Sequence, residues 1–238
     1  MHARSRVLVC AAAALLVLLG AAAHAQDKVP YGQSRLGLSD DLRDGTLYIP
    51  KSYAPGTPMP LLVMLHGFSG WGDNQRSLFG LAEELGFILV LPESRDITWG
   101  KEAAGFDQDV RYIGAAFRHV GSIVNVDFDR VALGGQSDGA GYALTMGLAY
   151  GETFNHLIVL AGGGLIEPIR RQGKPKIFVA HGVKDTTMPI DVSGRKNVKQ
   201  LKDEGYDVTY HEHDGGHGTP FEITREAMFW FLGKTPEK

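Results

Sequence analysis

Cysteine is nearly absent from this chain of 238 residues: Cys10 is the only one, and it lies inside the apolar N-terminal run. The rest of the chain therefore has no disulfide, no cysteine nucleophile and no cysteine-ligated metal. A lipid anchor is also disfavoured, because Cys10 does not follow the apolar run. A domain without disulfides depends on its hydrophobic core, and this length is sufficient for a full core.

The chain also lacks a strong charge of either sign. The formal net charge is −3, so nothing indicates a nucleic-acid partner. Hydrophobic residues make up 44% and charged residues 21%, an ordinary composition for a globular domain. No internal repeat, charge block or low-complexity linker divides the chain. We therefore expect one domain over residues 26–238; its oligomeric state stays open.

The N-terminus has the pattern of a secretory signal peptide. A short basic start at residues 1–6 precedes an apolar run at 7–22, and Ala23-His24-Ala25 forms an Ala-x-Ala cleavage motif. The run is too short for stable membrane insertion, although a retained anchor is the alternative. We predict a signal peptide at residues 1–25, cleavage near Ala25, and export to the periplasm or the medium.

Apolar strand-like runs alternate with helical patterns over the remainder of the chain. The spacing predicts an edge strand at 46–50 and strands at 61–65, 87–91, 130–133, 156–160, 176–180 and 207–211. It predicts helices that begin at an Asp73 cap, near residue 107, after the strand that ends at residue 133, near residue 192 and at a Thr219–Glu222 capping box. This alternation predicts an α/β fold, with a mostly parallel sheet covered by helices on both faces. Such sheets bind ligands beyond the carboxyl ends of their strands.

One motif between an expected strand and an expected helix has a specific chemical meaning. Gly135-Gln136-Ser137-Asp138-Gly139 has the Gly-x-Ser-x-Gly spacing of a nucleophile elbow. The turn at the serine is so sharp that both glycines are required, because a Cβ at either position would collide with its neighbours. Ser137 is therefore the candidate nucleophile.

A serine nucleophile needs a base, and the base needs an acid that orients it. Asp185 follows the expected strand 176–180, and His217 lies in Gly215-Gly216-His217-Gly218 before the last helix. The order Ser137, Asp185, His217 is the one expected for an α/β hydrolase. Each residue alone has a simpler interpretation as a turn or loop residue, but the three in this order predict a catalytic triad.

The oxyanion formed by serine attack requires preorganised hydrogen-bond donors. The backbone amide of Asp138, which directly follows the nucleophile, is one candidate, and the amide of Phe68 in the loop after strand 61–65 is the other. We assign His66 a structural task in shaping that loop. The Asp138 side chain has a simple alternative role, as a negative charge at a helix N-terminus.

Several motifs together resemble the α/β-hydrolase superfamily over residues 26–238. Within it, the chain resembles small bacterial serine esterases of the phospholipase/carboxylesterase and polyhydroxybutyrate-depolymerase-like group. The motifs are Leu65-His66-Gly67, Pro92-Glu93-Ser94-Arg95 with Thr98-Trp99, Gly135 to Ala140, His181-Gly182 with Asp185 and Pro189, Gly205 to Tyr210, and Gly216-His217.

This resemblance implies the α/β-hydrolase fold and hydrolysis of a small-molecule carboxylic ester without a cofactor. Ser137, Asp185 and His217 occupy the triad positions of the family. Related secreted depolymerases carry disulfides and a binding module that this chain lacks, which argues against a polymeric substrate. The chain also lacks an insertion long enough for a lipase lid, which argues against long-chain triglycerides.

Three questions stay open from the sequence. Trp99, Arg95 and Phe68 are candidates for the acyl or alcohol pocket, but Trp99 has an equal alternative as packing for its loop. His211 and His213 share one face of an expected strand and could join a metal site, although no third ligand is evident, so we predict no metal. A hydrolase scaffold that only binds its ligand is the remaining alternative to an enzyme.

Overall fold

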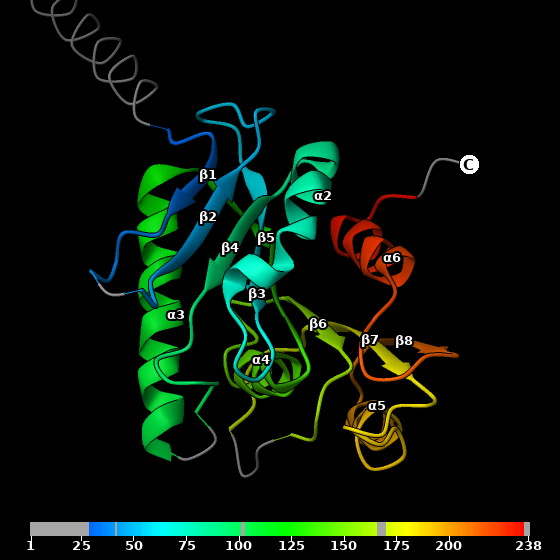
Figure 1. Ribbon diagram of the computed structural model, residues 1–238. Coiled ribbons are helices and arrows are strands. Elements are labelled where there is room, and N and C mark those ends of the chain that lie inside the picture. The colour runs from blue at the N-terminus through cyan, green and yellow to red at the C-terminus, as the bar shows by residue number, and fades with distance from the viewer. Residues whose placement is uncertain (1–28, 41, 101–102, 166–169, 236–238) are drawn as a thin grey trace, which may run out of the picture. The chain divides into compact units, whose positions relative to one another are not determined.

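A computed structural model describes residues 29–235 except 41, 101–102 and 166–169 (Figure 1). The predicted signal peptide lies outside the described residues. Within the described part of the chain, no helix is both long and apolar enough to cross a membrane.

Strands and helices alternate along the chain, as the apolar pattern predicted. The strands are β1 (Gly32–Arg35), β2 (Gly45–Ile49), β3 (Met59–Leu65), β4 (Ile88–Pro92), β5 (Val126–Gln136), β6 (His156–Leu160), β7 (Lys176–Gly182) and β8 (Val208–His213). The helices are a 3-10 turn η1 (Gly72–Gln75), α2 (Ser77–Leu85), α3 (Ala103–Ile123), α4 (Asp138–Ala149), α5 (Gly194–Asp203) and α6 (Phe221–Leu232).

The eight strands of the described residues form one sheet in the order β1-β2-β4-β3-β5-β6-β7-β8. All neighbours from β4 to β8 are parallel, whereas β1 pairs with β2 and β2 with β4 in antiparallel orientation. The prediction that residues 46–50 form an edge strand is wrong. β1, in a segment expected to be a surface lead-in, pairs with β2 and takes the edge, since its short polar sequence gives no strand signal.

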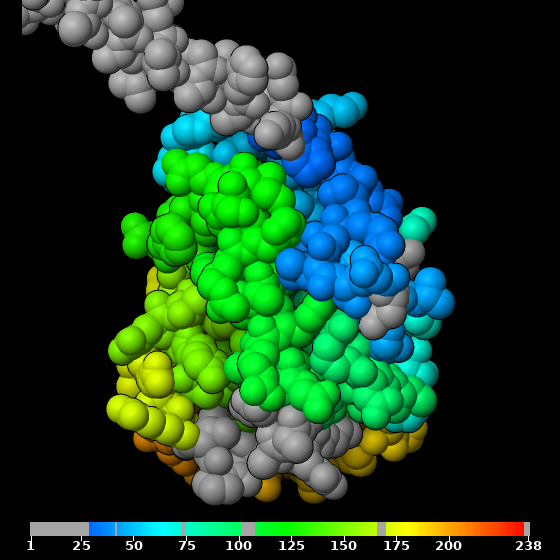
Figure 2. All heavy atoms as spheres, turned by 90° about the vertical axis from the view of Figure 1, so that its left-hand side faces the viewer, coloured from blue at the N-terminus to red at the C-terminus, as the bar shows by residue number. Residues whose placement is uncertain are grey.

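Helices cover both faces of the sheet. Alternate strand residues such as Leu62, Leu89 and Ile158 form one core with α2 and α6, which pack against each other (Figure 1). The residues between them are also buried and point to the opposite face because strand side chains alternate. There α3 contacts β4, and α4 contacts β3, β5 and β6. Figure 2 shows the α3 face, with the green surface of α3 beside the blue N-terminal strands.

Two predicted helix caps are not formed. Asp73 lies in η1, and α2 begins only at Ser77, after an Arg76 N-cap that has no side-chain hydrogen bond. Pro220 is the N-cap of α6 rather than its first helical residue, and the Thr219 hydroxyl has no hydrogen-bond partner within the described structure. The local capping pattern therefore does not decide where these two helices begin.

Candidate active site

The nucleophile elbow connects β5 directly to α4. Ser137 has a φ of 56°, a strained value that costs a non-glycine residue on the order of 1–3 kcal/mol. A Cβ on Gly135 would lie 2.3 Å from the Gly139 carbonyl carbon, and a Cβ on Gly139 would lie 2.3 Å from the His66 carbonyl oxygen. The prediction that both positions require glycine is therefore confirmed, and the turn sets the Ser137 hydroxyl at the carboxyl end of β5.

Three side chains from separate loops form a continuous hydrogen-bond chain. His217 Nε2 lies 2.8 Å from Ser137 Oγ, and His217 Nδ1 lies 2.8 Å from Asp185 Oδ2. The carboxylate can only accept a hydrogen bond, so His217 Nδ1 carries the proton that it donates to Asp185. His217 Nε2 then accepts the hydrogen bond of the serine hydroxyl. The sequence predicted that these residues follow different strands, and the parallel order of β5 and β7 brings their loops to the same edge.

The Asp185 carboxylate is buried, and protein groups donate hydrogen bonds to both of its oxygens. Its side chain is 0% exposed, and Oδ1 accepts the backbone amides of Thr187 at 2.9 Å and Met188 at 2.8 Å. Burial alone would raise the pKa of Asp185, but these amides and His217 outweigh it and hold the pKa below its usual value. The carboxylate is therefore ionised at neutral pH and can stabilise a protonated His217.

The loop that carries His217 packs on the end of β7. The amide of Val183 donates to the His213 carbonyl at 2.9 Å, and the amide of Lys184 donates to the Gly215 carbonyl at 2.9 Å. A Cβ on Gly182 would lie 2.3 Å from the Gly216 carbonyl oxygen, so this approach requires glycine. The acid loop and the base loop are thus joined backbone to backbone.

His66 shapes the loop on the other side of Ser137, as the sequence suggested. The imidazole is 1% exposed. Its Nδ1–H donates to the Gly67 carbonyl at 2.7 Å, and Nε2 accepts the Ser94 amide at 3.1 Å. Burial lowers the pKa of His66, which is therefore neutral. The ring joins the loop after β3 to the loop after β4.

Trp99 packs beneath this loop. Its side chain is 1% exposed, its indole N–H donates to the His66 carbonyl at 2.7 Å, and its ring stacks on Tyr142 at 5.6 Å between centroids. The contacts match the packing interpretation that the sequence left open. Trp99 supports the backbone next to the nucleophile.

The two candidate oxyanion donors flank Ser137. Asp138 follows it directly at the start of α4, and its carboxylate accepts the Thr98 hydroxyl at 3.1 Å. Phe68 follows Gly67, at which a Cβ would lie 3.4 Å from the Ser137 Cβ. Phe68 is 60% exposed.

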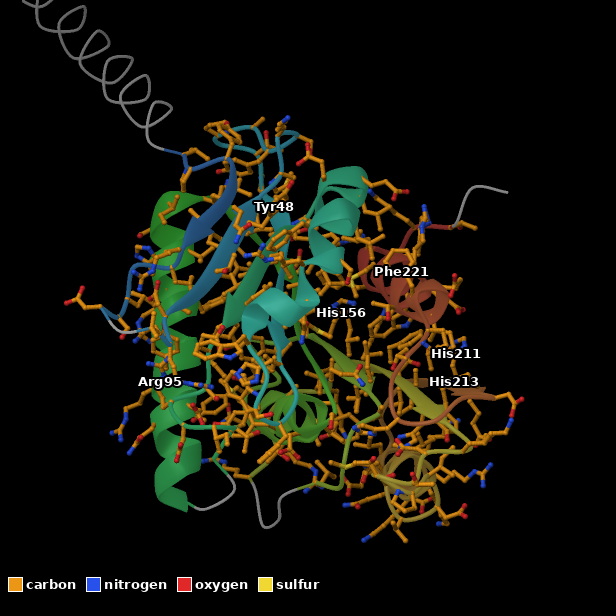
Figure 3. The ribbon with its side chains drawn as sticks, in the orientation of Figure 1. Tyr48, Arg95, His156, His211, His213 and Phe221 are labelled. Carbon is orange, nitrogen blue, oxygen red and sulfur yellow. The ribbon has the colours of Figure 1, made fainter. Side chains whose placement is uncertain are left out.

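Arg95 faces α3 rather than the elbow (Figure 3). Its guanidinium donates to the carbonyls of Arg43 and Glu93 and lies 3.6 Å from the centre of the Tyr112 ring. Arg95 and Trp99 also border a hollow of about 400 Å³, which Ile97 and Thr98 help to line. The guanidinium therefore holds the loop after β4 in place at the edge of this hollow.

His211 and His213 lie together on β8 (Figure 3). His211 stacks on Phe178 at 4.8 Å, and its Nε2 lies 3.6 Å from Glu226 Oε1 on α6. No group of three or more His, Cys, Asp or Glu side chains within the described residues is arranged to hold a metal ion. His211 is thus engaged with α6.

Two residues near the site were not singled out for a role by the sequence reasoning. His181, at the end of β7, has Nε2 3.1 Å from Asp185 Oδ2, and Thr98 binds the Asp138 carboxylate. His181 was visible as part of the His181-Gly182 motif, four residues before the acid. Thr98 was visible in the same way, as part of the Thr98-Trp99 motif.

Comparison with known proteins adds to this geometry. No protein-family model matches the sequence, and no curated protein matches it. Among solved structures, esterase PE8 matches 80% of this chain over 98% of its own length, with 21% identity and a TM-score of 0.67. Esterase 2 of Thermogutta terrifontis, phosphonylated by cyclosarin, matches 88% of this chain over 98% of its own, with 17% identity and a TM-score of 0.69.

An acetyl xylan esterase from Aspergillus awamori is similar as well, over 84% of this chain and 99% of its own, with 16% identity and a TM-score of 0.66. These likenesses define the fold. The chain has the α/β-hydrolase fold, as the resemblance to small esterases led us to expect, with a mostly parallel sheet between layers of helices.

Proposed function

We propose that this chain is an exported serine hydrolase that cleaves carboxylic esters through an acyl-enzyme. Ser137 is the nucleophile, His217 the general base and acid, and Asp185 the residue that orients His217. The observation that carries the proposal is the hydrogen-bond chain from Ser137 Oγ through His217 to Asp185, with 2.8 Å at each step.

In the first half-reaction, His217 Nε2 accepts the Ser137 proton as Oγ attacks the ester carbonyl carbon. The backbone amides of Phe68 and Asp138 stabilise the oxyanion. The carbon–oxygen bond to the alcohol then breaks, and His217 donates its proton to the departing oxygen. Asp185 holds the correct tautomer and stabilises the charged imidazole throughout.

In the second half-reaction, water takes the place of the alcohol. His217 removes a proton from this water, which attacks the acyl carbon, and the proton passes to Ser137 Oγ as the acid is released. The protons balance over the cycle, and this mechanism requires no cofactor.

The fold neighbours support ester hydrolysis as the general class of reaction. Each of the three compared structures is named as an esterase, and one of them carries a phosphonyl group from cyclosarin. Organophosphorus compounds of this type react with activated serines. We transfer only the reaction class to this chain.

The loops after β3 and β4 expose apolar side chains that suit small to medium acyl groups. Phe68 is 60% exposed and Ile97 is 53% exposed, and the two loops are joined by the Ser69 amide, which donates to the Ile97 carbonyl at 3.0 Å. Exposed apolar side chains at a polar site offer contact area for a hydrocarbon chain. We assign this surface to binding of the acyl group. We assign export of the protein to the segment 1–25.

The test uses residues 26–238, wild type beside Ser137→Ala. The wild type should react covalently with a fluorophosphonate probe and hydrolyse p-nitrophenyl esters, with an optimum at short or medium acyl length. Removal of the nucleophile should lower kcat by on the order of 10⁶-fold and abolish labelling. Circular dichroism should show the same fold in both proteins.

Two outcomes would contradict the proposal. Substantial ester hydrolysis by purified Ser137→Ala would assign the activity to another residue. A folded wild type that neither reacts with the probe nor hydrolyses any ester would favour the alternative of a hydrolase scaffold that only binds its ligand.

A further inference from the structure

A second histidine, besides His217, contacts the Asp185 carboxylate. His181 is the penultimate residue of β7 and is 0% exposed. Its Nε2 lies 3.1 Å from Asp185 Oδ2, the same oxygen that accepts His217 Nδ1 at 2.8 Å. The proposed reaction makes no use of this buried imidazole.

The surroundings of His181 determine which nitrogen carries its proton. Nε2 faces two acceptors, the Met188 carbonyl at 2.8 Å and Asp185 Oδ2. An acceptor nitrogen would be repelled by both oxygens, so Nε2 is protonated. Nδ1 has no hydrogen-bond partner among the described residues and lies against Gly194. A buried acceptor without a partner is tolerated better than a buried N–H, which agrees with this tautomer.

His181 therefore contacts both ends of the turn 185–188, at Asp185 and at Met188. Its N–H donates to the Met188 carbonyl, and the Met188 amide donates to Asp185 Oδ1 at 2.8 Å. The same N–H presents its positive end to Oδ2. Asp185 Oδ1 thus accepts two backbone amides, and Oδ2 accepts His217 Nδ1–H and lies 3.1 Å from His181 Nε2, which holds the carboxylate in one orientation.

We propose that His181 is a positioning residue that holds the Asp185 carboxylate against His217 during ester hydrolysis. This inference rests on the proposed function, because it assigns a further residue to the same reaction. His181 touches neither the substrate nor the reacting atoms, so its effect passes entirely through Asp185.

The alternative is that His181 only fixes the backbone of the loop, and Ser193 provides the matched control. The Ser193 hydroxyl donates to the Pro189 carbonyl at 2.7 Å and lies 3.1 Å from the Met188 carbonyl. The hydroxyl also lies 3.5 Å from His181 Nε2, so Ser193→Ala removes this contact with the loop contacts but keeps the imidazole beside Asp185. If backbone fixation were the whole role, Ser193→Ala and His181→Phe would have the same effect.

The first readout is the low-field proton resonance of His217 Nδ1–H, which requires no substrate. It should shift or broaden in His181→Phe, remain in Ser193→Ala, and return in His181→Gln, whose amide reaches the place of Nε2. The kcat for a p-nitrophenyl ester should fall by about 10- to 100-fold in His181→Phe with KM unchanged, because the N–H that lies 3.1 Å from the charged carboxylate is lost.

The second readout is the coupling to Asp185. In an Asp185→Asn background, His181→Phe should cause no further loss of kcat, because the group through which it acts is gone. Should His181→Phe fail to fold, His181→Asn beside His181→Gln makes the same comparison, since the shorter amide ends at the place of Nδ1.

An unchanged resonance with an unchanged kcat in His181→Phe would overturn the inference. The inference would also be overturned if His181→Phe lowered kcat as much in the Asp185→Asn background as in the wild type. It would be overturned as well if Ser193→Ala changed the resonance and kcat as much as His181→Phe does. Failure of the proposed function is distinguishable, because it would appear in Ser137→Ala and would leave the resonance of His217 in place.

Discussion

Two sides of the site position Ser137 in different ways. The oxyanion side comprises residues 66–70 and 93–99, and the acid–base side comprises residues 181–193 and 213–217. Each contains a buried histidine, His66 or His181, whose side-chain nitrogen hydrogen-bonds to loop backbone. On the oxyanion side both nitrogens are bonded to backbone groups and the Glu93 carboxylate lies 3.6 Å from Nε2, whereas on the acid–base side the Asp185 carboxylate lies closer to Nε2, at 3.1 Å.

Under the proposed mechanism, this difference corresponds to what each side has to hold. The oxyanion side must keep backbone amides in place, and a neutral imidazole between two loops is sufficient for that purpose. The acid–base side must hold a buried negative charge in one orientation, which requires N–H groups directed at it from several sides. Loss of a contact should therefore cost more activity on the acid–base side.

The largest effect should come from Asp185→Asn. An amide beside His217 Nδ1 stabilises the wrong tautomer, and kcat should fall by about 10⁴-fold. The matched change on the oxyanion side is Thr98→Val, which removes the hydroxyl bonded to Asp138 and should lower kcat by less than about 10-fold. Steady-state kinetics on one p-nitrophenyl ester compares them. Equal losses would remove the distinction between the two sides.

A pair of glycines should give the next largest effect. Gly182→Ala brings a Cβ to 2.3 Å from the Gly216 carbonyl oxygen and must displace the loop of His217, so kcat and the thermal midpoint should both fall. Gly67→Ala brings a Cβ to 3.4 Å from the Ser137 Cβ, an ordinary contact, and should leave the thermal midpoint nearly unchanged. Differential scanning calorimetry measures the thermal midpoint of both variants, and a greater loss of stability in Gly67→Ala would contradict the expected order.

Much of the architecture was predictable because it depends on local pattern. The buried strands are continuous apolar runs, and parallel strands bring their carboxyl ends to one edge, so loops after β5, β7 and β8 were expected to meet. The structure places Ser137, Asp185 and His217 within hydrogen-bonding distance there. Their catalytic role stays a prediction.

The remainder depends on contacts between distant segments. β1 becomes an edge strand by pairing with β2, although its own sequence is short and polar. Trp99 is buried because Tyr142 and the His66 carbonyl lie beside it. His181 faces Asp185 because the turn after β7 folds back, and a spacing of four residues outside a helix does not predict that approach.

The smallest effect should be a pH-dependent one at His66. Burial, with a further contribution from Arg43 that the Gly67 carbonyl opposes, lowers the pKa of His66 below the 6.5 of the unfolded chain. Between these two values the unfolded state binds the proton and the folded state does not, so the free energy of unfolding falls as the pH drops through 6.5. His66→Gln keeps an acceptor for the Ser94 amide but cannot titrate.

Urea unfolding from about pH 8 to about pH 5 should therefore show a weaker loss of stability in His66→Gln than in the wild type. At the upper end of this range the variant should retain most of its esterase activity, because the oxyanion side needs a neutral hydrogen-bonding group and no charge. Parallel stability curves for the two proteins would mean that His66 titrates alike in both states. A collapse of activity at high pH would mean that this side depends on its imidazole as strongly as the acid–base side depends on Asp185.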